Sequence, residues 1–410
     1  MKQKLTSLEF QWICYDIGNS AFILLVATIL PIYFNALSSS AGIAESDYLS
    51  YWSYATSIST LIVAITGPIL GTIADYKGNK KKIFLSSALL GALSLACFWI
   101  PNSYFSFLVL YVVAKVCYSL SLIFYDSMVV DVTTTQRMDA ISSKGYAWGY
   151  IGSCVPFLLS LIFVLCYEKL GISMSAAMMI AFVINALWWI LFTLPLAKNY
   201  KQKYYIEKQP HVIKETFGRL TTTLKNARKQ KKIFLFLLAF FFFIDGVYTI
   251  IDMATAYGTS LGLNTTGLLL ALLVTQVVAF PASLFFAILS KTQDAAMLIK
   301  ICIVAYFCIA IFAIQLDKQW EFWILAVAVG CFQGGIQALS RSYYAKIIPE
   351  NASGEYFGLF DICGKGASFL GTFLIGFVTQ ITGQQNLGVA AISILFLIGF
   401  YLFNKVSKLD

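Results

Sequence analysis

Charged residues are scarce in this sequence: Asp, Glu, Lys and Arg together make up 12% of its 410 residues. An ordinary soluble domain has roughly 25%, so the shortage argues against a soluble fold. Hydrophobic residues instead make up 59% of the chain. They recur along its whole length in stretches of about 20 residues, the length that a helix needs to cross a membrane. We therefore predict a membrane protein without a separate soluble domain.

Residues and motifs typical of catalysis or metal binding are also scarce. The only histidine is His211, and the nine cysteines follow no CxxC or metal-ligand spacing, which indicates small buried residues. The motifs HExxH and GxSxG and a nucleotide-binding P-loop are absent. Tyr15-Asp16 and Tyr125-Asp126 match half of the intramembrane aspartyl protease signature, but its GxGD partner is missing. We expect neither an enzyme nor a bound cofactor or metal ion.

Twelve stretches are long and apolar enough to span a membrane. We predict that each is an α-helix, because a segment exposed to lipid must satisfy its backbone hydrogen bonds internally. The predicted spans are 9–36, 48–74, 83–100, 105–130, 142–167, 172–196, 233–258, 265–290, 296–315, 320–347, 355–382 and 386–404.

Basic connections between these spans alternate with acidic or nearly uncharged ones. The basic ones include 77–82, 137–144 and 198–232, and the last of these holds eleven of the 29 Lys and Arg residues. Because basic loops stay in the cytoplasm, we predict a multi-pass protein of the plasma (inner) membrane with both termini cytoplasmic. The net charge of +9 then reflects topology, and we expect no nucleic-acid partner.

The long basic segment divides the chain into two predicted bundles of six helices. These are residues 1–196 and 233–410, joined by a cytoplasmic linker at 197–232. Within the linker, four apolar residues from Ile213 to Leu224 follow helical spacing among basic residues, which predicts an amphipathic helix on the inner leaflet. A solvated basic linker fits the same pattern.

The two halves resemble each other weakly, as an internal duplication in transporters predicts. DIGN in the first span matches DGV in the seventh, and FYDSMVVD at 124–131 matches LSRSYYAK at 339–346. The second match places Asp126 opposite Arg341. We therefore expect two pseudo-symmetric bundles.

The sequence GTIADYKGNKKK, residues 71–82, lies at the turn between the second and third spans. Gly71 and Gly78 allow close helix approach and a tight turn. Asp75 can accept backbone donors at the N-terminus of a neighbouring helix. This sequence resembles the loop motif of the major facilitator superfamily, and the resemblance implies a gating role for Gly71, Asp75 and Gly78.

Further motifs narrow the resemblance: WICYDIGNSAF (12–22), TGPILGTIAD (66–75), GGIQALSRSYYAKIIP (334–349) and EYFGLFDICGKGASFLG (355–371). Together they resemble the branch of this superfamily named for the fungal vacuolar, autophagy-associated amino-acid effluxer, over nearly the whole chain. The resemblance implies an all-α membrane protein with the major facilitator fold, in which twelve transmembrane helices form two pseudo-symmetric six-helix bundles. It also implies export of amino acids.

Three charged residues are predicted to lie near the middle of the membrane. Counting about 1.5 Å per residue from the ends of their spans puts Lys115, Asp245 and Lys365 roughly 15–20 Å deep. Such charges are costly and usually face a bundle interior or a water-filled cavity. We predict that they form part of a central site, where charges of both signs suit a zwitterionic solute. A structural ion pair that only orients helices is the alternative.

Polar and aromatic residues supply further candidates for the substrate or coupling site. Asp16 and Asn19 lie one turn apart on the first span and share a face, which indicates either a cavity lining or hydrogen bonds between helices. Tyr125 and Trp148 are candidates for the cavity wall, although most aromatic residues in such a chain serve packing or the interfacial belt.

A second group of charged residues is predicted nearer the cytoplasmic ends of the helices. Asp126, Arg341 and Asp361 could form a gate network whose ion pairs break and reform as the halves move. A static salt-bridge cluster is the alternative. A coupling proton would need a titratable carboxylate, for which Asp16, Asp245 and Asp361 are the candidates.

These features together predict a secondary active transporter that moves a small solute by alternating access between the two halves. Amino-acid efflux and proton coupling are the more specific expectations. A non-transporting membrane sensor or scaffold with a transporter fold is the alternative, since the fold does not by itself establish the function. The expected partners are a small, zwitterionic solute, the lipid bilayer and a coupling proton, and we expect a monomer.

Overall fold

The computed structural model describes residues 4–42, 45–101, 103–207, 230–365 and 368–409. Within these ranges the chain is mainly helical, with an isolated β-bridge between Tyr76 and Ile206. The helices are α1 (Ser7–Ser40), α2 (Glu45–Ala74), α3 (Asn79–Ala96), α4 (Tyr104–Ser127), α5 (Val129–Val132), α6 (Met138–Leu165), α7 (Met174–Asn199), α9 (Lys231–Ser260), α10 (Thr265–Leu289), α11 (Ala295–Ala313), α12 (Gln319–Ile347), the 3-10 helix η1 (Glu350–Ala352), α13 (Ser353–Lys365), α14 (Ser368–Thr382) and α15 (Gln385–Val406).

Ten helices in the described part of the chain are long and apolar enough to cross a membrane. Two predicted spans are not among them. The helix α3 has 18 residues and begins with three lysines in its first turn, so its apolar part is short. The predicted span 355–382 is described as two helices, α13 and α14, of 13 and 15 residues. The all-α membrane fold is confirmed, and within the described residues ten of the twelve predicted spans meet the length and composition of a membrane span.

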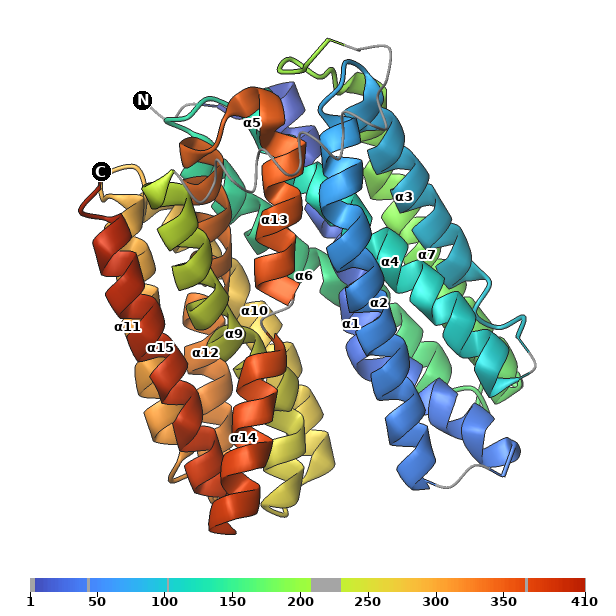
Figure 1. Cartoon of the computed structure of the whole chain (residues 1–410). Helices are drawn as coiled ribbons and strands as arrows, with labels where there is room; N and C mark the ends of the chain where they lie inside the picture. Colours follow the sequence, from blue (N-terminus) through green and yellow to red (C-terminus); the bar gives the residue numbers. More distant parts are fainter. Residues whose placement is uncertain (1–3, 43–44, 102, 208–229, 366–367, 410) are drawn as a thin grey trace.

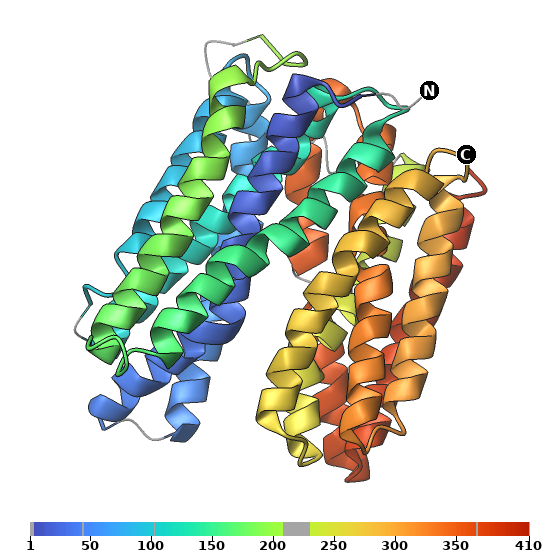
Figure 2. The same ribbon diagram turned by 180° about the vertical axis from the view of Figure 1, so that it is seen from behind.

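The helices form two groups (Figure 1). The first contains α1 to α7 and the second contains α9 to α15, and both chain termini lie at the same end, which we call the terminal end. The groups meet there, where α13 packs against α2, and they diverge toward the opposite end. Figure 2 shows α6 of the first group beside α10 of the second, where the two groups meet. The predicted amphipathic helix of the linker lies outside the described residues.

Local sequence explains how the helices at the terminal end begin. Thr6 caps α1, because its hydroxyl accepts from the Glu9 N–H while the Glu9 carboxylate accepts from the Thr6 N–H. Gly78 precedes α3 with φ of +76°, a left-handed conformation that favours glycine. The turn between α2 and α3 is therefore tight, and it places Asp75 and Lys80 side by side.

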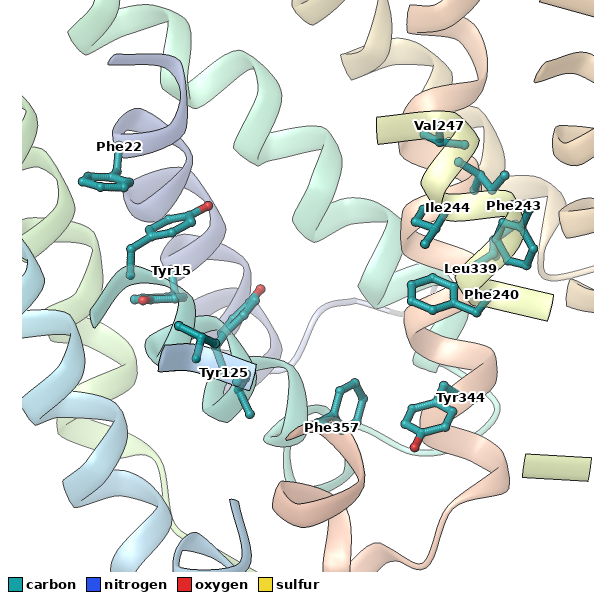
Figure 3. Close-up of a cluster of buried hydrophobic side chains, with 14 of the residues drawn as sticks. Tyr15, Phe22, Tyr125, Phe240, Phe243, Ile244, Val247, Leu339, Tyr344 and Phe357 are labelled. Carbon is teal, nitrogen blue, oxygen red and sulfur yellow. The ribbon is translucent and has the colours of Figure 1, made fainter. Parts of the chain in front are cut away.

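Buried aromatic residues fill the interior of both groups (Figure 3). In the first group, the rings of Tyr15 and Tyr125 lie 4.7 Å apart and join α1 to α4. In the second group, the ring of Phe240 stacks at 4.1 Å on that of Phe360, which in turn stacks on Tyr344. Each such pair contributes about 0.5–1.5 kcal/mol beyond the area it buries. These contacts lie within the groups, so each group has an aromatic core of its own.

Candidate gate and translocation site

Helices α2 and α13 touch through their backbones at the terminal end. A Cβ atom on Gly71 would lie 2.3 Å from the carbonyl oxygen of Gly354, and one on Gly354 would lie 2.7 Å from the Gly71 carbonyl oxygen. A Cβ on Gly358, one turn further along α13, would lie 2.8 Å from the Cα of Pro68. Because backbone atoms cannot move aside as a side chain can, this approach requires glycine at Gly71 and Gly354.

Asp75 links the first group to the N-terminus of α13. Its carboxylate oxygens accept the N–H groups of Gly354 at 2.8 Å and Glu355 at 3.0 Å, and the side chain is fully buried. A negative charge is favourable at a helix N-terminus, where N–H groups lack helical partners. The predicted type of contact for Asp75 is therefore present, and it joins the two groups. The gating role of Gly71, Asp75 and Gly78 stays a prediction.

Asp75 has an unusual electrostatic environment. Burial raises the pKa of the Asp75 carboxyl to about 7, although the Lys80 ammonium 3.9 Å away and the two backbone donors act in the opposite direction. The contact is thus sensitive to protonation near neutral pH.

Arg341 of α12 makes a second connection between the groups. Its guanidinium lies 2.8 Å from the Asp126 carboxylate of α4 and 3.5 Å from the Asp16 carboxylate of α1. It also donates to the hydroxyl and the carbonyl oxygen of Ser142 on α6, at 2.9 and 3.0 Å. Only 2% of Arg341 is exposed. Arg341, a buried cation of the second group, is therefore held by carboxylates and a serine of the first group.

Aromatic rings enclose this ion pair. The Arg341 guanidinium lies over the rings of Trp12 at 4.6 Å and Tyr146 at 4.4 Å. The Tyr125 hydroxyl donates to Asp16 at 2.6 Å, and Asn19 reaches the other Asp16 oxygen at 3.5 Å. Tyr125 is fully buried, so it orients Asp16 instead of lining a cavity as predicted. Asp16 and Asn19 share a face, in agreement with their spacing, and that face serves hydrogen bonding here.

The other two residues predicted near this region lie close to it. Asp361 of α13 is partly exposed, and its negative charge acts on Asp126. Asp361 therefore lies near the predicted network, where it adds a second negative charge close to Asp126. Trp148 is 43% exposed and makes an edge contact with Phe280 of α10 at 5.3 Å, so it lies between the two groups.

Asp139 forms a further connection that the sequence did not reveal. From the first turn of α6 it accepts the Ser342 hydroxyl at 2.7 Å and pairs with the Lys346 ammonium, both of α12. Its sequence signal is weak, because an acidic residue in the first turn of a helix is common. This pair lies beside Arg341 and adds to the closure of the terminal end.

The charges of Lys115 and Asp252 act on each other across the two groups. Lys115 of α4 is partly exposed, with its ammonium 5.8 Å from the centre of the Tyr111 ring. Asp252 of α9 is exposed, and the charges of Lys115 and Asp252 act on each other. Within the described part of the chain, Lys115 and Asp252 form no direct ion pair, although their charges act on each other. Asp252 was not among the candidates from the sequence.

The structure does not bring Asp245 to Lys115. The Asp245 carboxylate accepts the N–H of Gly371 in α14 with both oxygens, at 3.0 and 3.1 Å, and the hydroxyl of Thr249 at 3.2 Å. It is fully buried and lies about 10 Å along α9 from Asp252. Asp245 thus joins α9 to α14 through its hydrogen bonds to Gly371. The side chain of Lys365 lies outside the described residues.

A cavity of about 380 Å³ lies within the second group, toward the end opposite the terminal end. Its lining is mainly apolar and includes Ile250, Met253 and Tyr257 of α9 and Gly376 and Thr379 of α14. Within the described residues, no group of three His, Cys, Asp or Glu side chains could hold a metal ion.

Comparisons with known proteins agree with this architecture. A family model described as vacuole effluxer Atg22 like matches residues 7–408. The chain is 42% identical to an uncharacterized MFS-type transporter, YxiO, of Bacillus subtilis, over all of this chain and 96% of that protein. It is 23% identical to autophagy-related protein 22 of Coccidioides immitis, over 86% of this chain and 72% of that one.

Solved structures share the fold at low sequence identity. The major facilitator transporter FucP in its outward conformation matches with a TM-score of 0.73 at 14% identity, over 98% of this chain and 99% of FucP. A bacterial homologue of the iron transporter ferroportin, in an outward-facing state, matches with a TM-score of 0.68 at 13% identity, over 98% of both chains. At these identities the likeness concerns the fold alone.

Proposed function

Because the chain belongs to the Atg22-like vacuole effluxer family of major facilitator transporters, we propose that it moves a small solute across the membrane by alternating access. The terminal end is the cytoplasmic end if basic loops stay inside. The present arrangement, joined at that end and divergent at the other, is then the outward-facing state. FucP and the ferroportin homologue, the structural neighbours named above, are also outward-facing.

The observation that carries this proposal is the polar character of the contact between the groups. Arg341 is buried, yet its charge is neutralised by Asp16 and Asp126 of the other group. Separation of the groups would admit water to these charges, and hydration would offset much of the lost ion pairing. A purely apolar interface has no such compensation on opening. Ion pairs that break and reform are a recurring device of rigid-body transitions.

We assign the solute to the space between Lys115 and Asp252. The two opposite charges belong to different groups and act on each other without direct contact. A zwitterionic solute could place its carboxylate at Lys115 and its ammonium at Asp252, and so bridge the groups. Amino acids have this chemistry, and the effluxer family favours export as the direction.

Proton coupling is assigned to the Arg341 network. Asp16 and Asp126 share a single guanidinium, so the buried cluster has more negative than positive charge. A proton on Asp16 would remove that excess and weaken its hold on Arg341. Asp245 is assigned to holding α9 against α14 instead of to binding solute or proton.

Transport by the purified full-length protein in liposomes tests the proposal. A panel of labelled amino acids would be offered under imposed pH gradients of either sign. We expect saturable flux of at least one zwitterion, with a rate that responds to the gradient. Lys115→Gln and Asp252→Asn should each raise the solute concentration that gives half-maximal flux. Lys169→Gln, at an exposed site, is the control. Specific binding without flux would instead identify a sensor or scaffold.

A further inference from the structure

The first residues of the linker pack onto residues 75–80 between α2 and the start of α3, which we call the gate turn. We call residues 200–207, which follow α7, the strap. Ile206 of the strap pairs with the turn through two backbone hydrogen bonds: its carbonyl accepts from the Lys77 N–H at 3.1 Å, and its N–H donates to the Asp75 carbonyl at 2.8 Å. Gln202 donates to the Ala74 carbonyl at 3.1 Å and accepts the Gly78 N–H at 3.0 Å. The strap therefore follows the gate turn closely.

One buried carboxylate joins the strap to the gate. Asp131 of α5 is fully buried, and one of its oxygens accepts the backbone N–H groups of Lys203 at 2.9 Å and Tyr204 at 3.0 Å. The other oxygen accepts the hydroxyl of Tyr200 and lies 3.5 Å from the Lys80 ammonium. Asp131 thus holds three donors of the strap and one cation of the gate turn.

Lys80 carries this connection across to the second group. Its fully buried ammonium donates to the hydroxyl of Ser353, the first residue of α13, at 2.8 Å. It also lies 3.9 Å from Asp75, which accepts the next two N–H groups of α13. A continuous polar path therefore runs from the strap through Asp131 and Lys80 to α13.

Charge balance explains why the strap matters to this path. Asp75 and Asp131 share the single ammonium of Lys80, so one negative charge needs other partners. The strap supplies two backbone N–H groups and one hydroxyl to Asp131. Buried carboxylates without enough donors are strongly disfavoured. If the strap left, Asp131 would draw Lys80 toward itself or take up water, and either change would weaken the contact of Lys80 with Ser353.

We propose that Asp131 is a positioning residue through which the linker holds the cytoplasmic gate closed. The strap keeps Asp131 satisfied, Asp131 fixes Lys80, and Lys80 with Asp75 holds the N-terminus of α13. A change in the linker thereby alters the balance between the closed and open gate without touching the solute site. This inference rests on the gate assigned above to the terminal end.

Hydrogen exchange of the full-length protein in lipid nanodiscs tests this inference. The reporter is the segment 353–360, because the Gly354 and Glu355 amides exchange only when they leave Asp75. Tyr200→Phe removes one donor to Asp131, and Asp131→Asn removes its charge. We expect each to speed exchange in 353–360 about tenfold or more, the effect of losing one charge-assisted hydrogen bond. Lys201→Ala, at an exposed residue of the strap, should leave exchange there unchanged.

A folding control and two substitute variants keep the outcome decisive. Unchanged exchange in α11, which packs against α12 and α15, would establish that a variant is folded. If Asp131→Asn fails this control, Tyr200→Phe and Lys203→Pro, which removes a backbone donor, still test the path. Faster exchange confined to 75–80 and 200–207, with 353–360 as slow as in the native protein, would overturn the inference. That result would leave the proposed transport untouched, because no flux is measured.

Discussion

Replacing Gly71 with alanine should open the gate at the terminal end. The new Cβ would lie 2.3 Å from the Gly354 carbonyl oxygen, whereas a carbon and an oxygen need roughly 3.3 Å. The helices α2 and α13 would therefore separate by about 1 Å, which would stretch the 2.8 Å hydrogen bond from Gly354 to Asp75 to about 3.8 Å. At that length the bond is lost.

The energetic consequence can be estimated from that bond. A hydrogen bond to a charged group contributes about 1.5–3 kcal/mol, so its loss should shift the balance from closed toward open about 10- to 150-fold. Alanine also favours a helix over glycine by about 1 kcal/mol. This second effect acts equally on both states, because α2 stays helical in each.

Distances between spin labels across the gate would measure the shift. Lys82 and Asn351 are exposed and belong to different groups, so labels there in a cysteine-free background report the separation of the terminal ends. Gly376→Ala is the matched control, because its Cβ would meet nothing within 4 Å. We expect a new long-distance population for Gly71→Ala and none for Gly376→Ala. Identical distance distributions in the two variants would refute the claim that backbone contact at Gly71 holds the gate.

The other predictions concern the ion pairs and the solute site. Arg341→Gln leaves Asp16 and Asp126 buried without their cation, which costs about 3–5 kcal/mol; the same label distances should lengthen, more than for Arg341→Lys, and an unchanged distribution would remove Arg341 from the gate. The Asp75 carboxyl has a higher pKa when buried in the closed gate, about 7, than its ordinary value of 3.8. Closure therefore takes up a proton, so the closed state should lose stability as pH rises between these two values and change little above them; a slope that persists in Asp75→Asn would contradict this. Lys115→Gln and Asp252→Asn should each raise the half-saturating concentration of a zwitterionic solute about tenfold, as the loss of one charged contact implies; a value equal to that of Lys169→Gln would exclude this pair from the site.

The sequence predicted the parts of this protein that depend on local pattern. Stretches of about 20 apolar residues identified the helices, and the motifs around Asp75 and Arg341 identified the family, which the family match confirms. The weak internal duplication also placed Asp126 opposite Arg341, and the two side chains form an ion pair at 2.8 Å. Such features survive in sequence because helix length, turn geometry and repeat spacing are properties of the chain itself.

What the sequence left out depends on how helices face each other. Depth along the helix favoured Asp245 for the solute site, yet the Asp245 carboxylate accepts the Gly371 N–H. Asp252, about two turns further along α9, is the residue whose charge interacts with that of Lys115. Asp131 likewise gave no separate signal, because its partners lie about 70 residues away in the linker. Side-chain partners on separate elements follow from helix rotation and tilt, which spacing within one helix does not fix.

Counterflow in liposomes tests alternating access most directly. Vesicles loaded with an excess of an unlabelled transported amino acid would be diluted into a trace of the labelled form. A carrier that exposes one solute site to the two sides in turn should accumulate label transiently above the external concentration, and then lose it as the internal pool drains. Label that rises only to the external concentration, without an overshoot, would indicate a channel, and no uptake at all would indicate a sensor or scaffold.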